Sequence, residues 1–461
     1  MLDFLCELCV SALEKNSFTL EKQSSRRIFE IASSKYKMLY KFFSMFSMSL
    51  CGEKYLLKFN FMKIKSIIST FFVIISLSTF CFGQIKDFTK YVNPFVGTGG
   101  HGHTFPGATV PFGAVQLSPD TRIDNWDGSS GYHYSDNEIF GFSHTHLSGT
   151  GIPDYCDILV TPRIDGNNSR TFSHQNETAT AGYYSVKMDN GIFAEMTATQ
   201  RVGLHRYTFP DAKFVNLDFN LKWRDKVLDS QVKIVGKNRI EGYRRSSSWA
   251  RDQIIYFVAE FSEPFVSSSI AVDDTITERS ERLTEANGTN LIAMLRFDNS
   301  DKKPILVKVG ISAVDIEGAI KNLNTEVPHW SFEKVRTDAK AAWNRELSKI
   351  EVSGGTDDQL KTFYSALYHV NIQPNVFSDV DGRYRGIDKK IYNLNGNPKS
   401  KIQNPKITPF FRCGIHFVPR IRFTQLLTKN GRRILSTPLF VNMNRADDCL
   451  CGNWRAMKLI V

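Results

Sequence analysis

Between Gln84 and Val314 the sequence consists of short runs in which apolar and polar residues alternate, separated by turn-forming residues. A period of two places every second side chain on the same face of a β-strand. Two clear runs are Ile254–Phe261 and Pro304–Val314. In the first, one face would carry Ile255, Phe257, Ala259 and Phe261. Many short strands at this spacing predict a β-sandwich over residues 84–314.

One hairpin can be predicted in more detail. Tyr184–Met188 and Ile192–Thr199 both alternate, and Asp189-Asn190-Gly191 lies between them. Asn-Gly supplies the positive φ angles that a tight hairpin turn requires. We therefore expect two adjacent antiparallel strands here.

The period changes near Asp315, where apolar residues begin to recur at helical spacing. Ser331–Ile350 carries one apolar stripe, made of Phe332, Val335, Ala339, Ala342, Trp343 and Leu347. Thr356 and Gln359 then fit a capping box, which predicts a helix over Thr356–Val370. The predicted fold class is therefore mainly β, with an N-terminal sandwich followed by helices.

The net charge of +11 would suggest a nucleic-acid or membrane-surface partner if it were spread over the folded body. It is concentrated at the two ends of the chain instead. Residues 1–61 carry +3, residues 62–83 carry +2 and residues 407–461 carry +7, which leaves −1 for residues 84–406. The body is nearly neutral, so no nucleic-acid partner is predicted.

Residues 91–163 contain glycine, histidine, aromatic and carboxylate residues at high density. Glycine lets the backbone turn and approach a ligand closely, and loops held by a scaffold commonly carry binding residues. A turn-rich β-meander with satisfied polar side chains would have the same composition. The stretch therefore indicates a ligand site without specifying its chemistry.

Four segments in and after this stretch strongly resemble the N-terminal signature of glycoside hydrolase family 92, the calcium-dependent exo-acting α-mannosidases. They are NPFVGTGGHGHTFPGATVPFGAVQLSPDT (Asn93–Thr121), SGYHY (Ser130–Tyr134), GFSHTHLSGTG (Gly141–Gly151) and RVGLHRYTFP (Arg201–Pro210). The resemblance covers roughly Phe88 to Asp388. It implies a supersandwich-like β-sandwich at 84–314, a helical linker at 315–349 and the start of an (α/α)6 barrel at 350–390.

The resemblance also implies a function. The family cleaves α-mannosides of glycoproteins with inversion, and this chain looks α-1,2-mannosidase-like. An acid and a base would lie on opposite sides of the sugar, about 6.5–9.5 Å apart. Calcium would be held by oxygen ligands, mostly on the barrel. Mannose-containing glycans are the implied partners, and the membrane is involved only through targeting.

The N-terminal region has the features of a secretory signal. Met62–Gly83 begins with two lysines, continues with a short apolar run and ends in a small residue, so cleavage before Gln84 is expected. A signal anchor is the alternative, although the run is short for a membrane span. This predicts a periplasmic or secreted protein. Residues 1–61 would then be a non-native upstream extension.

The C-terminal region departs from the family after about Lys390, and residues 391–461 are expected to be an out-of-frame tail. A shifted reading from Ile407 allows FSLWDTFRA and LPVWELAGNET, which both resemble barrel motifs of the family. The motif of the acid resembles the GNET of that shifted frame, and the base would lie beyond it. No catalytic residue is therefore assigned, and the chain as printed is expected to be a fragment without activity.

The candidate substrate-binding residues come from three places in the sequence. His103 and Trp126 are the main pocket candidates, because an aromatic face packs on a sugar and an imidazole can bond a hydroxyl. Arg383 and Arg385 lie in DVDGRYRGID, a barrel loop by resemblance, and are candidate hydroxyl donors. The third group is His144, His146 and Asp154. Structural packing is the alternative for each residue.

Metal ligation has only weak support in the sequence. His144 and His146 would face the same side of a strand and, with Asp154, could form the metal site of a metallo-hydrolase. Asp379-Val380-Asp381-Gly382 begins like a calcium loop but lacks the later acidic ligands. Cys156, the only cysteine of the body, is expected to be a small packed hydrophobe. A stand-alone carbohydrate-binding sandwich is the other alternative function.

Overall fold

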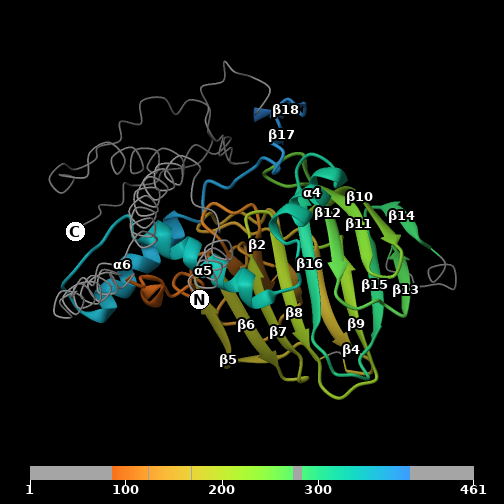
Figure 1. The fold of residues 1–461 in the computed structure, drawn as a ribbon, viewed down its shortest axis with the longest axis horizontal. Coiled ribbons are helices and arrows are strands. Elements are labelled where there is room, and N and C mark those ends of the chain that lie inside the picture. Colours follow the sequence, from red (N-terminus) through yellow and green to blue (C-terminus); the bar gives the residue numbers. More distant parts are fainter. Residues whose placement is uncertain (1–85, 123, 168, 274–282, 395–461) are drawn as a thin grey trace, which may run out of the picture. The chain divides into compact units, whose positions relative to one another are not determined.

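The computed structural model describes residues 86–394, except 123, 168 and 274–282 (Figure 1). The predicted signal peptide, the predicted upstream extension and residues 395–461 lie outside this part. Two large antiparallel sheets dominate the described residues. The mainly β fold class, a sandwich followed by helices, is therefore confirmed.

The strands follow each other in the sheets in an order that differs from their order in the chain. The seven-stranded sheet has the order β1 (Ala108–Thr109), β2 (Gln116–Asp120), β3 (Gly141–Ser143), β4 (Leu159–Ile164), β9 (Phe214–Asn220), β15 (Leu291–Asp298) and β13 (Ser267–Val272). The nine-stranded sheet has the order β14 (Glu285–Gly288), β10 (Lys226–Val235), β11 (Arg239–Ser247), β12 (Gln253–Phe261), β16 (Ile305–Ser312), β8 (Val202–Thr208), β7 (Phe193–Ala198), β6 (Tyr183–Met188) and β5 (Phe172–Thr180). A small hairpin, β17 (Arg383–Arg385) and β18 (Ile391–Asn393), follows the helices.

The main core lies between the two sheets and contains side chains from both. Phe219 and Leu295 come from the seven-stranded sheet, and Phe257 and Val309 from the nine-stranded sheet; all four are fully buried. The alternation in β12 puts its four predicted inward residues into this core, as expected from the sequence. Burial of one face of each strand therefore explains the sandwich.

The predicted hairpin forms between β6 and β7, but its turn differs from the expectation. Gly191 has φ +89, whereas Asn190 keeps a negative φ, so only one residue of the pair is left-handed. Gly191 N donates to Met188 O, and Met188 N to Ile192 O. The turn is thus wider than the two-residue type that Asn-Gly favours.

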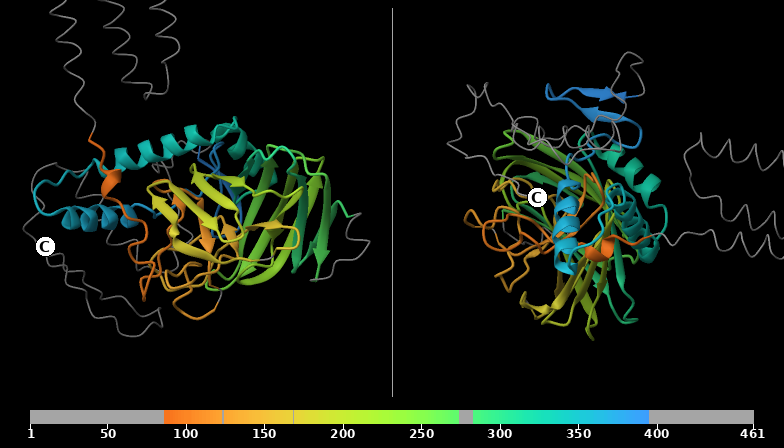
Figure 2. Two further views of the ribbon diagram at one scale, coloured as in Figure 1. Left: turned by 90° about the horizontal axis from the view of Figure 1, so that it is seen from below. Right: turned by 90° about the vertical axis from the view of Figure 1, so that its left-hand side faces the viewer.

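Three α-helices follow the sandwich in the described residues, and each begins at a side-chain cap. Asp315 caps α4 (Ile316–Glu326), and Ser331 caps α5 (Phe332–Leu347). The predicted capping box of Thr356 and Gln359 opens α6 (Asp357–Val370). Helices α4 and α5 pack on the nine-stranded sheet, as Figures 1 and 2 show. In the described part, none of the helices has the length and apolarity needed to cross a bilayer.

Trp343 anchors α5 to the rest of the fold. Its side chain is fully buried, its ring lies 4.2 Å from that of Tyr368 in α6, and its Nε1 donates to Thr109 O at 2.6 Å. One residue thus joins both helices to β1.

Replacing Trp343 with phenylalanine should lower the free energy of unfolding by about 1–3 kcal/mol, because the buried Thr109 carbonyl loses its donor. Urea denaturation followed by circular dichroism measures this. The control is Trp330→Phe, at a residue 36% exposed, where we expect a change within about 0.5 kcal/mol. Equal losses in the two variants would contradict the role given to the hydrogen bond.

Candidate functional site

Three loops meet around Trp126, a residue that is 53% exposed. The ring of His103 lies 4.1 Å from it at an interplanar angle of 67°, and the ring of His101 lies 5.3 Å away. Gly149 N donates to His103 O, which joins the loop of Gly149 and Gly151 to the loop of His101 and His103. A Cβ on Gly151, at φ +63, would lie 2.7 Å from Trp126 Nε1, so glycine is required there. The loops hold the tryptophan ring in one place; we call it the Trp126 platform.

His103 is buried and packs against the indole of Trp126. Its side chain is 7% exposed, and its Nδ1 shares a 2.9 Å hydrogen bond with Ser129 Oγ. Burial lowers its pKa, so the ring is neutral at neutral pH. The sequence suggested that His103 bonds a sugar hydroxyl directly. Its burial against Trp126 instead makes it a positioning residue for the ring.

His101 is the exposed histidine of the platform, and the sequence argument missed it. Its Nδ1 lies 2.6 Å from Asp127 Oδ1, next to Trp126. The sequence GHGH places His101 and His103 two residues apart. Their side chains lie in different environments only if the loop turns between them. Nothing in a local pattern showed which of them would remain at the surface.

A cavity of about 430 Å³ lies where the nine-stranded sheet meets the segment from Asn375 to Lys389. Its wall is largely apolar, with Ile254, Ile311 and Phe377, and Arg385 is among its polar residues. Arg385 therefore remains a candidate hydroxyl donor. Tyr155 also lines the cavity. It lies four residues after Gly151, which contacts Trp126, so the cavity is close to this loop of the platform.

Asp252 lines this cavity and forms ion pairs with two basic side chains. Its carboxylate accepts from Arg245 at 2.6 and 2.8 Å and from the Lys389 ammonium. The hydrogen bonds from Arg245 and then Lys389 hold the pKa of Asp252 well below its usual range. The carboxylate is thus charged, and it ties the loop after β17 to the sandwich.

Arg383 does not face the cavity, in contrast to the expectation that it binds a sugar. Its guanidinium donates to Asp315 at 2.6 Å and to Asp381 at 2.8 Å. Asp379 accepts from Asn322 and Ser312. The carboxylates of the run from 379 to 382 are therefore engaged by protein donors.

His144 belongs to a buried polar chain that joins the two sheets. Its Nδ1 donates to Ile158 O at 2.9 Å, so its Nε2 accepts from His205 Nε2 at 2.9 Å. His205 Nδ1 in turn accepts from Tyr207 OH at 2.8 Å. Burial lowers the pKa of His144 to about 4, and that of His205 well below its ordinary value. Both rings are neutral and structural, so His144 is not a substrate ligand.

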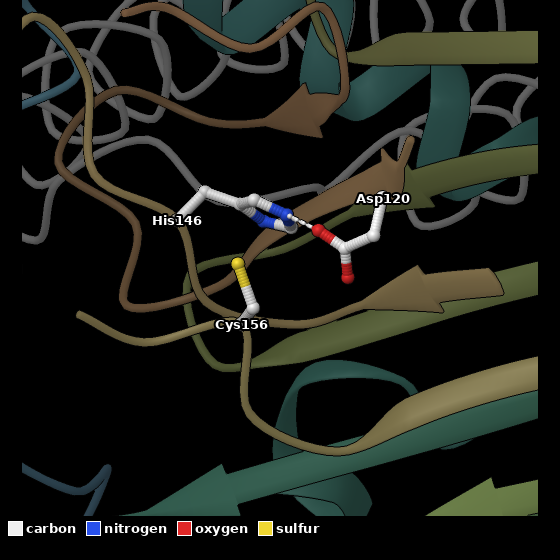
Figure 3. Close-up of side chains that lie close together, drawn as sticks. All are labelled: Asp120, His146 and Cys156. Carbon is white, nitrogen blue, oxygen red and sulfur yellow. Dashed lines mark hydrogen bonds and ion pairs between the residues drawn. The ribbon is translucent and has the colours of Figure 1, made fainter. Parts of the chain in front are cut away.

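His146 lies in a second buried cluster, with Asp120 and Cys156 (Figure 3). Its Nδ1 donates to Gln116 O at 2.8 Å, and its Nε2 to Asp120 Oδ1 at 3.0 Å. Burial alone would lower the pKa of His146, but the Cys156 sulfur and the Asp120 carboxylate outweigh it and raise the pKa to about 10. The ring is therefore a buried imidazolium, which no substrate can reach.

The ligand atoms of this cluster lie within 4.8 Å of one another, which makes it the one three-residue candidate for a metal among the described residues. Arg224 Nη1, however, lies 3.4 Å from Cys156 Sγ. A guanidinium beside the sulfur and a histidine of high basicity both oppose a divalent cation. We assign an ion-pair network. Cys156 is buried as expected, but it contacts charged groups.

Asp154 completes the list of predicted residues and is also structural. It is buried and accepts from Trp249 N at 3.1 Å and from Ala250 N at 2.7 Å. The structure therefore does not bring His144, His146 and Asp154 together, because each has separate partners. This removes the geometric basis for the metallo-hydrolase alternative.

Two domain models of a single protein family match most of this chain. The profile described as the glycosyl hydrolase family 92 N-terminal domain matches residues 91–312, and the profile of its catalytic domain matches residues 318–414. The chain belongs to glycoside hydrolase family 92. The match to the family 92 catalytic domain runs beyond Lys390, where the resemblance was expected to stop.

Relatives of known structure agree with this assignment. A family 92 α-mannosidase from Bacteroides thetaiotaomicron is 35% identical, with a TM-score of 0.63, and the match covers 67% of this chain and 44% of that one. A family 92 inverting mannosidase from the same organism is 28% identical, with a TM-score of 0.61 and coverages of 68% and 44%.

A curated relative, an uncharacterized secreted glycosidase from Arthroderma benhamiae, is 31% identical over 337 residues, which is 63% of this chain and 42% of that protein. The chain thus spans less than half the length of each of these relatives.

Proposed function

We propose that this chain is the sugar-binding N-terminal part of an exo-acting, inverting α-mannosidase that acts on α-mannosides of glycoproteins. Family 92 membership supports it, as do solved relatives described as an inverting mannosidase and as an α-mannosidase in complex with mannoimidazole. The observation that carries the proposal is the Trp126 platform, an exposed indole face fixed by three loops.

The described residues would bind the sugar rather than move protons. The face of Trp126 packs on the apolar C–H face of a mannose unit. His101 and Asp127 at its edge exchange hydrogen bonds with hydroxyl groups. His103 keeps the indole in its orientation, and Arg385 donates from the cavity wall.

We assign no general acid or base within residues 86–394. The buried carboxylates Asp120, Asp154 and Asp157 are all engaged by protein donors. The acid and base motifs implied by the family resemblance are not found in the printed frame. We therefore propose that both groups belong to the barrel, and that the chain as printed releases no mannose.

Calcium stays a proposal for the barrel as well. Calcium prefers six to eight oxygen ligands, whereas the one candidate cluster among the described residues contains a cysteine and a histidine. This cluster therefore does not fit the ion, and no step of the proposed binding depends on calcium.

Replacing Trp126 with alanine should weaken binding of methyl α-mannobioside by about tenfold, which corresponds to about 1.4 kcal/mol. Titration of the full chain by calorimetry measures this. Trp126→Phe keeps an aromatic face and should retain most of the affinity. Trp330→Ala, on the nine-stranded side, is the matched control.

Equal binding of the corresponding glucobioside would contradict the mannoside proposal, and so would unchanged affinity in the alanine variant. Release of mannose by the printed chain would overturn the assignment of the acid and base to the barrel. Retention of the anomeric configuration in that product would refute inversion.

We also propose that the protein is exported to the periplasm or secreted. The signal-like Met62–Gly83 and the curated relative, which is described as secreted, support this. N-terminal sequencing of exported protein should begin at Gln84, and a peptide from residues 2–58 in it would reject the proposed start.

A further inference from the structure

The outer face of the seven-stranded sheet has no helix of the described part packed on it, since α4 and α5 contact the nine-stranded sheet (Figure 2). Strand register shows which side chains share this face. Thr161, Asp218 and Met294 lie side by side on β4, β9 and β15. Arg163 and its neighbours Asn216 and Arg296 form the next row. Five of these six side chains are polar, and Asp218 is the buried one among them.

Two hollows follow these rows and share Arg163. The first has a volume of about 350 Å³ and reaches from β3 to β15, and the second has about 870 Å³ and reaches β13. Small-ligand pockets commonly have about 300–1,000 Å³. The two hollows together extend over five neighbouring strands, from β3 to β13, and we call them the outer-face groove.

One end of the outer-face groove is aromatic. Trp223 and Phe140 both line the first hollow, with ring centroids 5.2 Å apart. Trp223 Nε1 donates to Asp120 Oδ2 at 3.0 Å, which fixes the indole, and the residue is only partly buried. A fixed, partly exposed indole offers an apolar surface to the C–H groups of a sugar.

The polar part of the groove carries paired charges and one unsatisfied acceptor. Arg163 pairs with Asp218 at 2.6 Å, and Arg296 with Asp165 at 2.6 Å. Within the described residues no donor reaches Asp218 Oδ1, and burial raises the pKa of this carboxyl group. Because the charges are paired within the face, an anion gains little there, whereas the partly exposed guanidinium groups of Arg163 and Arg296 can still donate to hydroxyl groups of a neutral ligand.

We propose that the outer-face groove is a second binding site, separate from the Trp126 platform, for a neutral oligosaccharide. The choice of mannose units rests on the proposed function; the site itself rests on the groove, its aromatic end and its paired charges. Such a site would hold a distant branch of a glycan while another branch lies at the platform.

The test uses the full chain labelled with 5-fluorotryptophan and titrated with linear mannotetraose. The chain has six tryptophans, so six ¹⁹F resonances can be assigned by single Trp→Phe replacements. We expect a saturable shift of the Trp223 resonance and none of the Trp330 resonance. A Trp126 shift with no Trp223 shift overturns the groove and leaves the proposed function intact.

A Trp223 shift without a Trp126 shift supports the groove and refutes the platform, so the two failures are distinguishable. Affinity electrophoresis in mannan gels supplies a second measurement. Trp223→Ala should reduce retardation at least tenfold and Trp223→Phe less than threefold, with circular dichroism confirming that both fold. Tighter binding of an acidic oligosaccharide than of mannotetraose would overturn the neutral class.

Discussion

Replacing Arg244 with alanine should lower the free energy of unfolding by about 3–5 kcal/mol, because it leaves two buried carboxylates without their cation. Arg244 is fully buried in β11 and donates to Asp157 Oδ1 at 2.6 Å, to Asp225 Oδ1 and to Leu221 O at 2.9 Å. Burial already raises the pKa of Asp225 in the presence of this guanidinium. Urea denaturation at pH 7 measures the loss.

Arg245 provides the matched control, because it is the next residue and points to the other side of the same strand. It pairs with Asp252, and its side chain is 41% exposed. Exposed ion pairs contribute about 0–1 kcal/mol, so Arg245→Ala should change stability little. A small loss at Arg244, or similar losses at both positions, would show that the buried network is not needed for stability.

The Arg244 network also supports the candidate site. Asp157 accepts from Thr145 Oγ1 and from Gln253 Nε2, both at 2.8 Å, and these two residues line the 430 Å³ cavity. We therefore expect Arg244→Ala to impair sugar binding along with stability, without itself touching the ligand.

Replacing Asp120 with asparagine should cost about 3–5 kcal/mol at pH 6, because a buried imidazolium loses its carboxylate partner. The effect depends on pH in a defined direction. The folded pKa of His146 is raised to about 10 from an ordinary 6.5, so the folded state binds the extra proton between these values. Its stabilisation is complete below pH 6.5 and is lost as pH rises through about 10.

Urea denaturation of wild type and Asp120→Asn at pH 6, 8 and 9.5 checks this expectation. The wild type should lose stability across the series, and the variant should lose less. Asp127→Asn is the control, because it removes the partner of the exposed His101 and should cost under about 1 kcal/mol. A wild-type stability that rises with pH over this range would contradict the assignment of an imidazolium.

Local sequence patterns predicted the elements of this fold well. The alternation in β12 and the cap of α6 are confirmed because each depends on neighbours within a few residues. The turn before Gly191 was predicted less accurately, because Asn190 does not take the expected positive φ. Periodicity shows which face of an element is apolar, but not which distant segment covers it.

The candidate site shows the same limit. Trp126 could be predicted as a binding residue from its residue type in the stretch 91–163. It is exposed, as a ligand platform requires. The role of His144 could not, because its partner His205 lies 61 residues away in another sheet. The loop from Tyr155 to Ile158 also takes left-handed conformations that no local pattern announces, and these turn Cys156 towards His146. Long-range packing, rather than residue type, therefore decides which candidate residues can contact a ligand and which have a structural role.

The hydrogen-bond chain from Tyr207 through His205 and His144 to Ile158 O runs in one direction only. It ends on a carbonyl that can accept but not donate, so the single proton of each neutral ring is assigned from that end. Exchanging one member alone for an apolar residue would leave a buried neighbour without its hydrogen-bond partner. Divergence at this point between the sheets should therefore proceed by joint replacement of the trio, with an apolar set as the simplest exchange.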